Sequence, residues 1–375
     1  MKPLRKFSLR SLHRQVGLAV AMLLLLCAAT GFALVWLGPL ERFLQPSLYS
    51  GHGSLRSVQA LVNSIEQRFG NQAKVTLRLP QLAGQAVRAE VATPRWTGEL
   101  ILDPDTAQIL QQTEALSTLR SVVFELHSNL LLGQFGKAAL AIGSAFFAGL
   151  FLTGLVVGWP RSARAWRELF KVRTHLPARI AWADSHRALG FVIGWAVLLS
   201  VASGTYMVWR PLSHGLTALL GQQRVLPAEL HARPLQSKGA KPLLSSLRTG
   251  SDFDAMVAKA NTELPDGAVV YVSYHGVEKA VRIRKRLPDD PHPNGLSSVW
   301  LDPLTCTVLK TVVWTQLDFG SRAFAWVYPF HSGQLWGAPH AWLNALMGLS
   351  LLGFVVSGLA TWWKRRVSSS PYTTS

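Results

Sequence analysis

Four apolar stretches without a charged residue constrain this chain most strongly. Each is long enough to cross the hydrocarbon core of a bilayer, which takes about 20 apolar residues in a helix. They cover residues 15–40, 138–160, 188–209 and 341–363. Charged residues make up only 15% of the chain and hydrophobic residues 49%, a composition that favours a membrane protein over a soluble one. The sequence therefore predicts a membrane α-helical protein with four transmembrane helices in a lipid bilayer.

The positive charge is concentrated beside these stretches. Fifteen of the 38 Lys and Arg residues, against two acidic residues, lie in segments 1–14, 161–187 and 364–375. Lys and Arg are enriched on the cytoplasmic side of membrane spans, so both termini and the 161–187 loop are predicted to be cytoplasmic. Residues 41–137 and 210–340 then lie outside. Because topology accounts for most of the net charge of +18, we expect no nucleic-acid partner.

The two halves of the sequence repeat one another. "LHRQVGL" at 12–18 matches "SHRALGF" at 185–191, and "ELHSNLLLG" at 125–133 matches "PFHSGQLWG" at 329–337. Every apolar stretch also carries a Thr-Gly or Ser-Gly pair with a tryptophan five residues later. The histidine-to-glycine spacing is 18 residues for the first motif and 27 for the second in both halves. We interpret the chain as two duplicated units, each with a helix, an external domain and a second helix.

Each external segment has the pattern of a small α+β domain. Helices are predicted at 55–69 and 252–263, before alternating stretches such as "KVTLRL" and "AVVYVSY". An Asp-Pro turn, at Asp103 in the first segment and Asp302 in the second, is predicted to join the last two strands. We therefore expect two small domains with antiparallel sheets, and both turns are expected to be reachable from outside the membrane.

The motifs together resemble the PepSY-associated transmembrane family of inner-membrane proteins linked to iron uptake. The resemblance rests on "HRxxG", "LHxxLLLG", "HRxxG" and "HxGxxxG" at the four helices and covers nearly the whole chain. It implies a bacterial inner-membrane protein with two PepSY-like periplasmic domains. Some members are di-haem ferric-siderophore reductases. The resemblance thus implies an enzyme that passes electrons across the membrane to a periplasmic ferric siderophore and releases Fe²⁺.

The four matched histidines are the candidate axial ligands. An ionisable group at membrane depth is costly and points to a function. The predicted topology places His13 and His186 on the cytoplasmic side and His127 and His331 on the outer side, which indicates two metal centres. Zinc takes four ligands, and neither level offers cysteine or carboxylates nearby. Haem needs two, and neutral imidazole suits its iron. Since the chain lacks CxxCH, we expect two b-type haems.

Other residues near these histidines are further candidates for contact with a cofactor, and each has a structural alternative. Arg14 and Arg187 directly follow His13 and His186, where they can pair with haem propionates or anchor the helix at the cytoplasmic side. The Thr-Gly and Ser-Gly pairs are expected to allow close helix packing or to make room for a porphyrin.

Four candidates lie around His331. His340, nine residues later, is a reserve ligand for the outer haem, because "GAPH" can break the helix between the two histidines. Trp326, Tyr328 and Trp336 are candidates for binding the substrate, with a membrane-interface role as the alternative. The remaining histidines have no repeat partner and are expected on the surface or in loops: His52, His175, His214, His231, His275 and His292.

Two other functions stay open. A non-enzymatic PepSY membrane protein would bind or regulate a partner, and its histidines would anchor helices without haem. A quinol-linked haem protein would transfer electrons without acting on iron chelates. The electron donor is not identified, and a quinol, a flavin or a reductase would each serve, because no dinucleotide-binding fingerprint is present.

Overall fold

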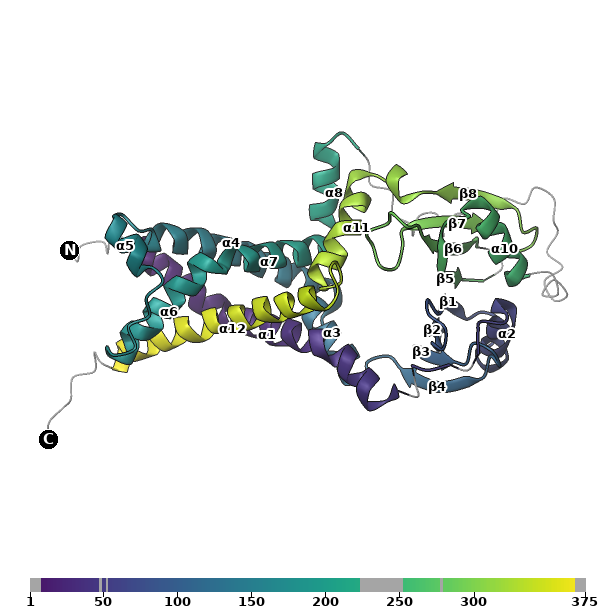
Figure 1. The fold of residues 1–375 in the computed structure, drawn as a ribbon, viewed down its shortest axis with the longest axis horizontal. Helices are drawn as coiled ribbons and strands as arrows, with labels where there is room; N and C mark the ends of the chain where they lie inside the picture. The colour runs from purple at the N-terminus through teal and green to yellow at the C-terminus, as the bar shows by residue number, and fades with distance from the viewer. Residues whose placement is uncertain (1–7, 47–48, 52, 223–251, 277–278, 368–375) are drawn as a thin grey trace. The chain divides into compact units, whose positions relative to one another are not determined.

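The computed structural model describes residues 8–46, 49–51, 53–222, 252–276 and 279–367. The chain folds into two compact units, a helical unit and a sheet unit (Figure 1). The helical unit comprises Met1–Leu37, Val122–Leu212 and Phe330–Ser375. The sheet unit comprises Gly38–Ser121 and Ser213–Pro329.

The helical unit contains the membrane spans. Three helices are long and apolar enough to cross a bilayer: α1 (Leu9–Leu44), α4 (Gly133–Gly158) and α12 (Ala338–Val367). A fourth span results if the bent pair α6 (Ala178–Val192) and α7 (Gly194–Val208) is counted as one. These helices match the four apolar stretches, and the chain is a membrane protein.

The third span is not the straight helix that its hydropathy suggests. Its two parts meet at Ile193 and are bent by 63°. A Cβ atom on Gly194 would lie only 2.6 Å from Cε2 of Phe151 on α4, so the close contact at this point requires a residue without a side chain. The Phe151 ring also packs edge-on against Trp195. The start of α7, directly after the bend, is thus packed against α4, which is remote in sequence.

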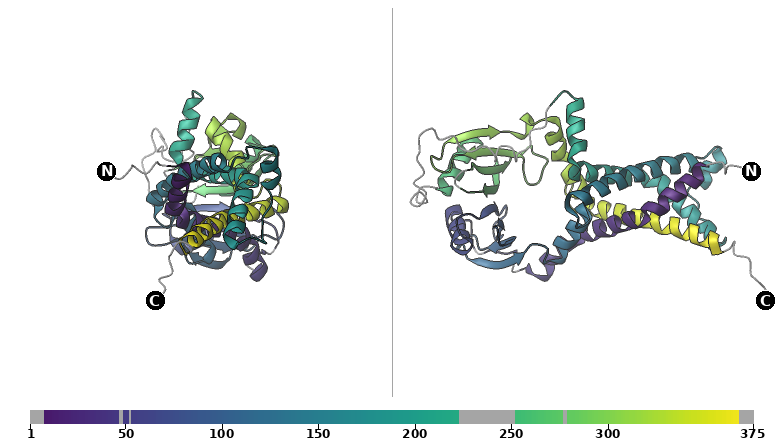
Figure 2. Two further views of the ribbon diagram at one scale, coloured as in Figure 1. Left: turned by 90° about the vertical axis from the view of Figure 1, so that its left-hand side faces the viewer. Right: turned by 180° about the vertical axis from the view of Figure 1, so that it is seen from behind.

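The spans pack around a small central cluster. Figure 1 labels α1, α4, α7 and α12 in the helical unit, and Figure 2 shows the helices of this unit from two further sides. Each of these four helices contributes to one buried apolar cluster, made of Ala28, Phe147, Val197, Met347 and Leu351. Interior positions of such a bundle lie between helices, whereas the outward apolar residues face the bilayer.

The sheet unit confirms the predicted helices and strands. The first half provides α2 (Val58–Phe69), β1 (Lys74–Arg78), β2 (Val87–Ala92), β3 (Thr97–Leu102) and β4 (Ile109–Glu114). The second provides α10 (Phe253–Glu263), β5 (Ala268–Tyr274), β6 (Val281–Arg286), β7 (Ser297–Leu301) and β8 (Val308–Val312). The remaining described elements are α3 (Leu119–Asn129), α5 (Ala163–Glu168), α8 (Arg210–Leu219), the 3₁₀ turn η3 (Trp314–Gln316) and α11 (Phe319–His331).

The two halves share one sheet, which corrects the expectation of two separate domains. The strand order is β4-β3-β2-β1-β5-β6-β7-β8, and every pair is antiparallel. The junction is β1 with β5, where Val75 pairs with Tyr274 and Arg78 with Tyr271. Each of these strands would be an exposed edge if its half folded alone, and pairing them satisfies the backbone groups of both.

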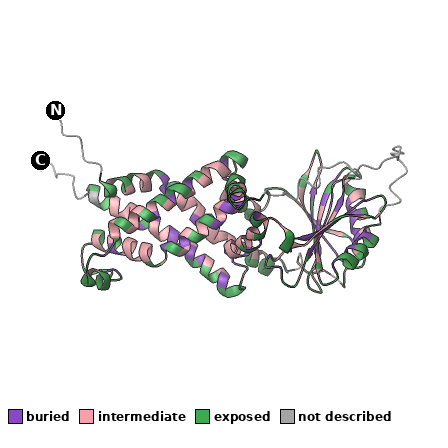
Figure 3. Ribbon diagram, turned by 90° about the horizontal axis from the view of Figure 1, so that it is seen from above, coloured by how far each residue is buried: buried purple, intermediate pink, exposed green. Residues whose placement is uncertain are grey.

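The core of the sheet unit lies on one face of the sheet. Alternate strand residues such as Leu77, Leu100 and Ile283 are fully buried there, together with Leu61 of α2 and Met256 of α10. Figure 3 shows buried positions, coloured purple, along the strands of this unit. The strand residues between them point to the opposite face, which carries the polar side chains.

Both predicted Asp-Pro turns are present, but their aspartates are buried. Asp103 is 1% exposed and Asp302 is 9% exposed, because each carboxylate accepts hydrogen bonds from the backbone of its own turn. Exposed neighbours, Asp105 and Thr305, are therefore the better positions to probe.

We predict that cysteines introduced at Asp105 and Thr305, in a chain whose native cysteines are replaced by serine, react with a membrane-impermeant maleimide added from the periplasmic side. A cysteine at Arg164, whose side chain is 89% exposed in the 161–187 loop, should react only after permeabilisation. Gel-shift labelling of spheroplasts measures this. The reverse pattern would overturn the predicted orientation.

Candidate cofactor-binding site

The four repeat histidines lie in the helical unit as two pairs. His13 of α1 faces His186 of α6, with ring centroids 6.3 Å apart. His127 of α3 faces His331 of α11, with ring centroids 6.2 Å apart. The pairing is the one expected from the repeat, and each pair takes one histidine from each half of the chain.

Every histidine is held by a hydroxyl from a Thr-Gly or Ser-Gly pair. Its Nδ1 lies 2.9–3.0 Å from the hydroxyl oxygen, and the partners are His13 with Thr153, His127 with Thr30, His186 with Ser357 and His331 with Ser203. The contacts are reciprocal within each half: the first motif binds the hydroxyl of the second span, and the second motif binds the hydroxyl of the first.

These hydrogen bonds determine the tautomer of each ring. The four hydroxyls donate to carbonyls of their own helices at Leu26, Gly149, Ser200 and Gly353, so each hydroxyl oxygen accepts from the imidazole. Nδ1 of His186 also lies 3.1 Å from the Phe354 carbonyl, and Nδ1 of His331 lies 3.0 Å from that of Ser200. A carbonyl only accepts, so Nδ1 carries the proton and Nε2 keeps its lone pair.

The glycine of each pair makes room for the ring. A Cβ atom on Gly204 would lie 2.8 Å from Cε1 of His331, and one on Gly31 would lie 3.0 Å from Cε1 of His127. The corresponding distances are 3.2 Å for Gly154 and His13 and 3.6 Å for Gly358 and His186. The glycines were expected to serve helix packing or a porphyrin, and the structure shows that their missing side chains admit the histidines.

The separation within each pair fits two imidazoles on one metal ion. An imidazole nitrogen lies about 1.1 Å from the ring centroid and a metal–imidazole bond is about 2.0 Å, so opposite ligands place their centroids roughly 6.3 Å apart. In the described part of the chain, no three His, Cys, Asp or Glu side chains lie together as a metal site. Each pair thus offers two imidazoles at a spacing compatible with axial ligation of one iron.

The surroundings of the second pair also favour neutral imidazole. Burial lowers the pKa of His127, and it lowers the pKa of His331 to about 4, with the neighbouring His127 adding to the effect. Both rings are thus uncharged at neutral pH, the form that binds a metal through Nε2.

The two arginines next to the first pair differ. Arg187 donates to the Glu168 carbonyl at 3.2 Å and to the Asp184 carboxylate at 3.4 Å. Asp184 is buried and also binds Arg173 through both carboxylate oxygens. Arg14 is exposed. Arg187 is therefore already engaged by the 161–187 loop, whereas Arg14 is the more accessible cation.

Among the described residues, His340 does not pair with another histidine ring. The helix is interrupted as predicted, since α11 ends at His331 and α12 begins at Ala338. Nδ1 of His340 accepts a hydrogen bond from the Leu335 backbone at 3.2 Å, and its ring packs on Phe330 and Trp336. Its Nε2 is buried without a partner among the described residues. These contacts give the reserve ligand a different environment from the other four histidines.

The three aromatic candidates lie in three different settings. Trp326 is 54% exposed and lines a pocket of about 340 Å³ with Trp314, Phe319 and Arg322. Tyr328 stacks on His292 with ring centroids 4.5 Å apart. Trp336 is 64% exposed and packs on His340. Trp326 and Tyr328 belong to the sheet unit, and Trp336 belongs to the helical unit.

Among the unmatched histidines, which were expected on the surface or in loops, His292 lies in a loop but is buried there. His292 is 2% exposed, and burial together with Arg284 and Arg286 lowers its pKa to about 3. It is buried because the loop before β7 folds it against Phe324 and Tyr328 of α11. His175 is exposed, and His214 and His275 are half-buried. His52 and His231 lie outside the described residues.

Comparison with known proteins places the chain in a family. Residues 10–365 match the model of the PepSY-associated TM region. The chain belongs to this family. No curated protein matches the chain. The PepSY match covers both sets of spans and the sheet unit, so it describes the whole molecule rather than one part.

The sequence pattern identified the histidines but not the residues that orient them. Thr30, Thr153, Ser203 and Ser357 were predicted, as members of the Thr-Gly and Ser-Gly pairs, to allow close helix packing or to make room for a porphyrin. Their constant offset from the histidines was the available signal: 17 residues after the first histidine of each half and 26 after the second. What the offset did not show is that each hydroxyl contacts the other histidine of its half.

We predict that Gly204→Ala lowers the thermal stability of the detergent-solubilised protein, because the added methyl group would overlap His331 and overpacking costs about 1–3 kcal/mol. Gly190→Ala is the matched control, since nothing lies within 4 Å of the methyl group that it adds. Differential scanning fluorimetry checks both. Equal melting temperatures for the two variants would contradict the ring contact.

Proposed function

We propose that this PepSY-family protein is a di-haem b-type ferric-siderophore reductase of the bacterial inner membrane. The observation that carries the proposal is the pair of bis-histidine sites, with centroids 6.3 and 6.2 Å apart and Nδ1 of every ring bound to a hydroxyl. His13 and His186 would hold one haem, and His127 and His331 the other. Bound haem would supply one-electron redox chemistry at each site.

The protein's own part is to present four neutral, oriented imidazoles. Thr30, Thr153, Ser203 and Ser357 keep the proton on Nδ1, so each Nε2 offers its lone pair without first losing a proton. Partners of this kind orient metal-bound histidines and raise their basicity. Because these hydroxyls also bond to their own helix backbone, the rings are tied to rigid spans rather than to mobile loops.

Two sites on different helix segments suit transfer across a membrane. His13 and His186 lie near the basic segments predicted to be cytoplasmic, and His127 and His331 lie on segments predicted to be on the periplasmic side. A protein with one site at each side can receive electrons from a quinol, a flavin or a reductase and deliver them outside. We place both termini in the cytoplasm and the two halves of the sheet unit in the periplasm.

The proposed substrate is a ferric siderophore in the periplasm. Reduction releases the ion, because Fe²⁺ carries less charge and is bound more weakly than Fe³⁺ by hard oxygen ligands. The sheet unit is the part of the chain available to bind such a chelate, since the helical unit is occupied by the spans and the histidine pairs.

We predict two haems per chain. A pyridine haemochrome assay on the purified protein, with the protein amount taken from amino-acid analysis, should give a ratio near two, and the reduced spectrum should show sharp low-spin α-bands. A colourless but folded preparation would favour the alternative, a non-enzymatic protein that binds or regulates a partner.

We predict opposite defects for His331→Ala and His13→Ala. His331→Ala should retain about one haem and abolish or strongly slow ferric-siderophore reduction, while chemical reduction of the remaining haem is preserved. His13→Ala should retain the other haem and block its reduction from the cytoplasmic side. Haem content and stopped-flow reduction in inverted vesicles measure both. His175→Ala, at an exposed loop position, is the control and should behave as the wild type.

Two outcomes would redirect the proposal. If His331→Ala keeps both low-spin haems and normal reduction, the ligand assignment is wrong and His340→Ala becomes the next variant to measure. If both haems are present but no ferric chelate is reduced while quinol oxidation is retained, the protein is a quinol-linked electron carrier instead.

A further inference from the structure

The polar face of the sheet, opposite α2 and α10, carries an uneven distribution of charge. Two rows of side chains cross this face in register. One row includes Arg88, Arg78, Tyr271 and Arg284. The next includes Glu99, Glu90, Ser273, Arg282 and Trp300. The carboxylates belong to the first half of the chain and the aromatic residues to the second.

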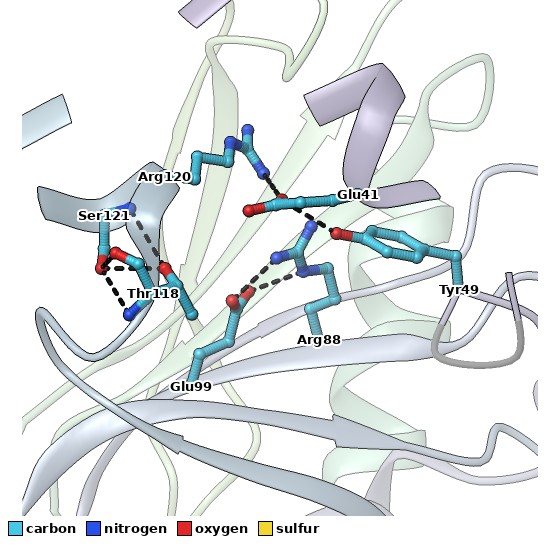
Figure 4. A network of polar contacts seen from close by, with 7 residues as sticks. All are labelled: Glu41, Tyr49, Arg88, Glu99, Thr118, Arg120 and Ser121. Carbon is cyan, nitrogen blue, oxygen red and sulfur yellow. Dashed lines mark hydrogen bonds and ion pairs between the residues drawn. The ribbon is translucent and has the colours of Figure 1, made fainter. Parts of the chain in front are cut away.

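In the first half, Arg88 and Arg120 are paired with carboxylates (Figure 4). Arg88 donates through Nε and Nη2 to both oxygens of Glu99, at 2.6 and 2.7 Å. Arg120 lies 3.6 Å from Glu41, which also accepts from the Tyr49 hydroxyl. A bidentate pair of this kind satisfies the guanidinium within the protein. The charges of Arg88 and Arg120 are thus met by acidic side chains of the protein.

In the second half, the corresponding carboxylates have been replaced. "AVRAE" at 86–90 aligns with "AVRIR" at 280–284, so Arg282 matches Arg88 and Arg284 stands where the first half has Glu90. Glu99 is matched by Ser298, which accepts from Nε of Arg282 at 3.0 Å. The second half thus has two adjacent arginines at the positions where the first half has one arginine and a glutamate, with a second glutamate beside them. The fold itself does not require the arginine pair, because the first half forms without it.

The two arginines lack an ion partner in the described part of the chain. Nε of Arg284 donates to the Gly295 carbonyl, and the guanidinium groups lie 5.6 Å from the Tyr271 ring for Arg284 and 5.1 Å from the Trp300 ring for Arg282. Asp290 is the acidic side chain whose charge acts on Arg284. Its carboxylate accepts hydrogen bonds from the backbone N–H groups of His292 and Leu296. Among the described residues, the hydrogen bonds of the two guanidinium groups are both made through Nε.

Two further observations indicate that something negative belongs here. Burial, and then the charge of Arg284, lower the pKa of Arg282 to about 9, and burial lowers the pKa of Arg284 against the opposing effect of Tyr271 and Asp290. Trp300 is 4% exposed, and its indole N–H is buried without a partner among the described residues. Half-buried charges without an ion pair and buried donors without an acceptor cost free energy, and such costs are typical of binding sites.

We propose that Arg282 and Arg284, with Arg78 and Trp300 beside them, form a binding site for a polycarboxylate anion. This inference rests on the proposed function, in which the anion is a ferric chelate of the carboxylate class. Guanidinium groups hold carboxylates through two parallel hydrogen bonds, and the aromatic rings keep them flat and in place. Arg78 lies 6.0 Å from the Tyr271 ring on the side away from Arg284, which widens the site for a ligand with several carboxylates.

The chemistry of the site also sets its selectivity. Three guanidinium groups repel a cationic ferric trihydroxamate and offer a neutral chelate no ion pair. A ferric tricarboxylate keeps a negative charge and outward oxygens after iron is bound. Among the aromatic substrate candidates, Tyr328 of α11 interacts electrostatically with Arg284 and Tyr271, and its ring stacks on His292.

The test is a calorimetric titration of the full-length protein in detergent with citrate, ferric citrate and the cationic ferrioxamine B. The wild type should bind both citrate forms, more weakly as ionic strength rises, and should not bind ferrioxamine B. Arg284→Gln and Arg282→Gln should each weaken binding at least about tenfold, since hydrogen bonds between charged groups are lost. Arg68→Gln removes a charge from an exposed position in α2 and should bind as the wild type.

Melting temperatures without ligand separate binding from structural roles. If the arginines serve the ligand, Arg284→Gln should be as stable as the wild type or more so, because repulsion between the arginines is relieved. Failure of the wild type to bind either citrate form, or equal binding by Arg284→Gln, would overturn the site. Haem content is measured on the same samples: a colourless protein that binds citrate retains this site and loses the proposed reductase function, whereas a di-haem protein that does not bind citrate loses only this site.

Discussion

The hydrogen bond from Nδ1 of each histidine to a span hydroxyl is the interaction on which the helical unit depends. It connects α1 with α3 and α4 in the first half, and α6 and α7 with α11 and α12 in the second. It also decides which nitrogen is protonated, because each hydroxyl donates to its own helix. A buried imidazole left without such a partner would be costly in an apolar bundle. The same bond that makes the histidine tolerable therefore prepares Nε2 to bind a metal.

The close approach of the helices follows from this bond. His331 can reach Ser203 only if its Cε1 passes over Gly204, where a methyl group would lie 2.8 Å away. In each Thr-Gly or Ser-Gly pair, the hydroxyl of the first residue forms a hydrogen bond with the ring, and the glycine leaves space for the ring. The repetition of this pair at Thr30, Thr153 and Ser357 gives all four rings the same chemistry. The third span is bent by 63° at Ile193, and its second part still provides the Ser203 hydroxyl and the Gly204 space for His331.

The sheet unit shows how two similar halves came to differ in chemistry. Pairing of β1 with β5 removes two edges and makes one surface from both halves. On that surface, Arg88 has a carboxylate partner, whereas its counterpart Arg282 has a serine and a second arginine. A pair of half-buried arginines is unfavourable for the folded chain, and its presence in only one half separates the requirements of the fold from those of a ligand.

The sequence by itself determined the spans, the helices and strands of each half, and the four histidines as candidate ligands. These are set by hydropathy, by residue alternation and by an exact repeat, all of which are local in the chain. Only the tertiary structure decided that the halves share one sheet, that the third span is bent, and that His292 is buried. It also showed what holds each ring, because Ser203 and His331 are 128 residues apart and no local pattern encodes their contact. Strand order, hydrogen-bond partners and burial depend on packing between distant segments, which is where the sequence pattern carries least information.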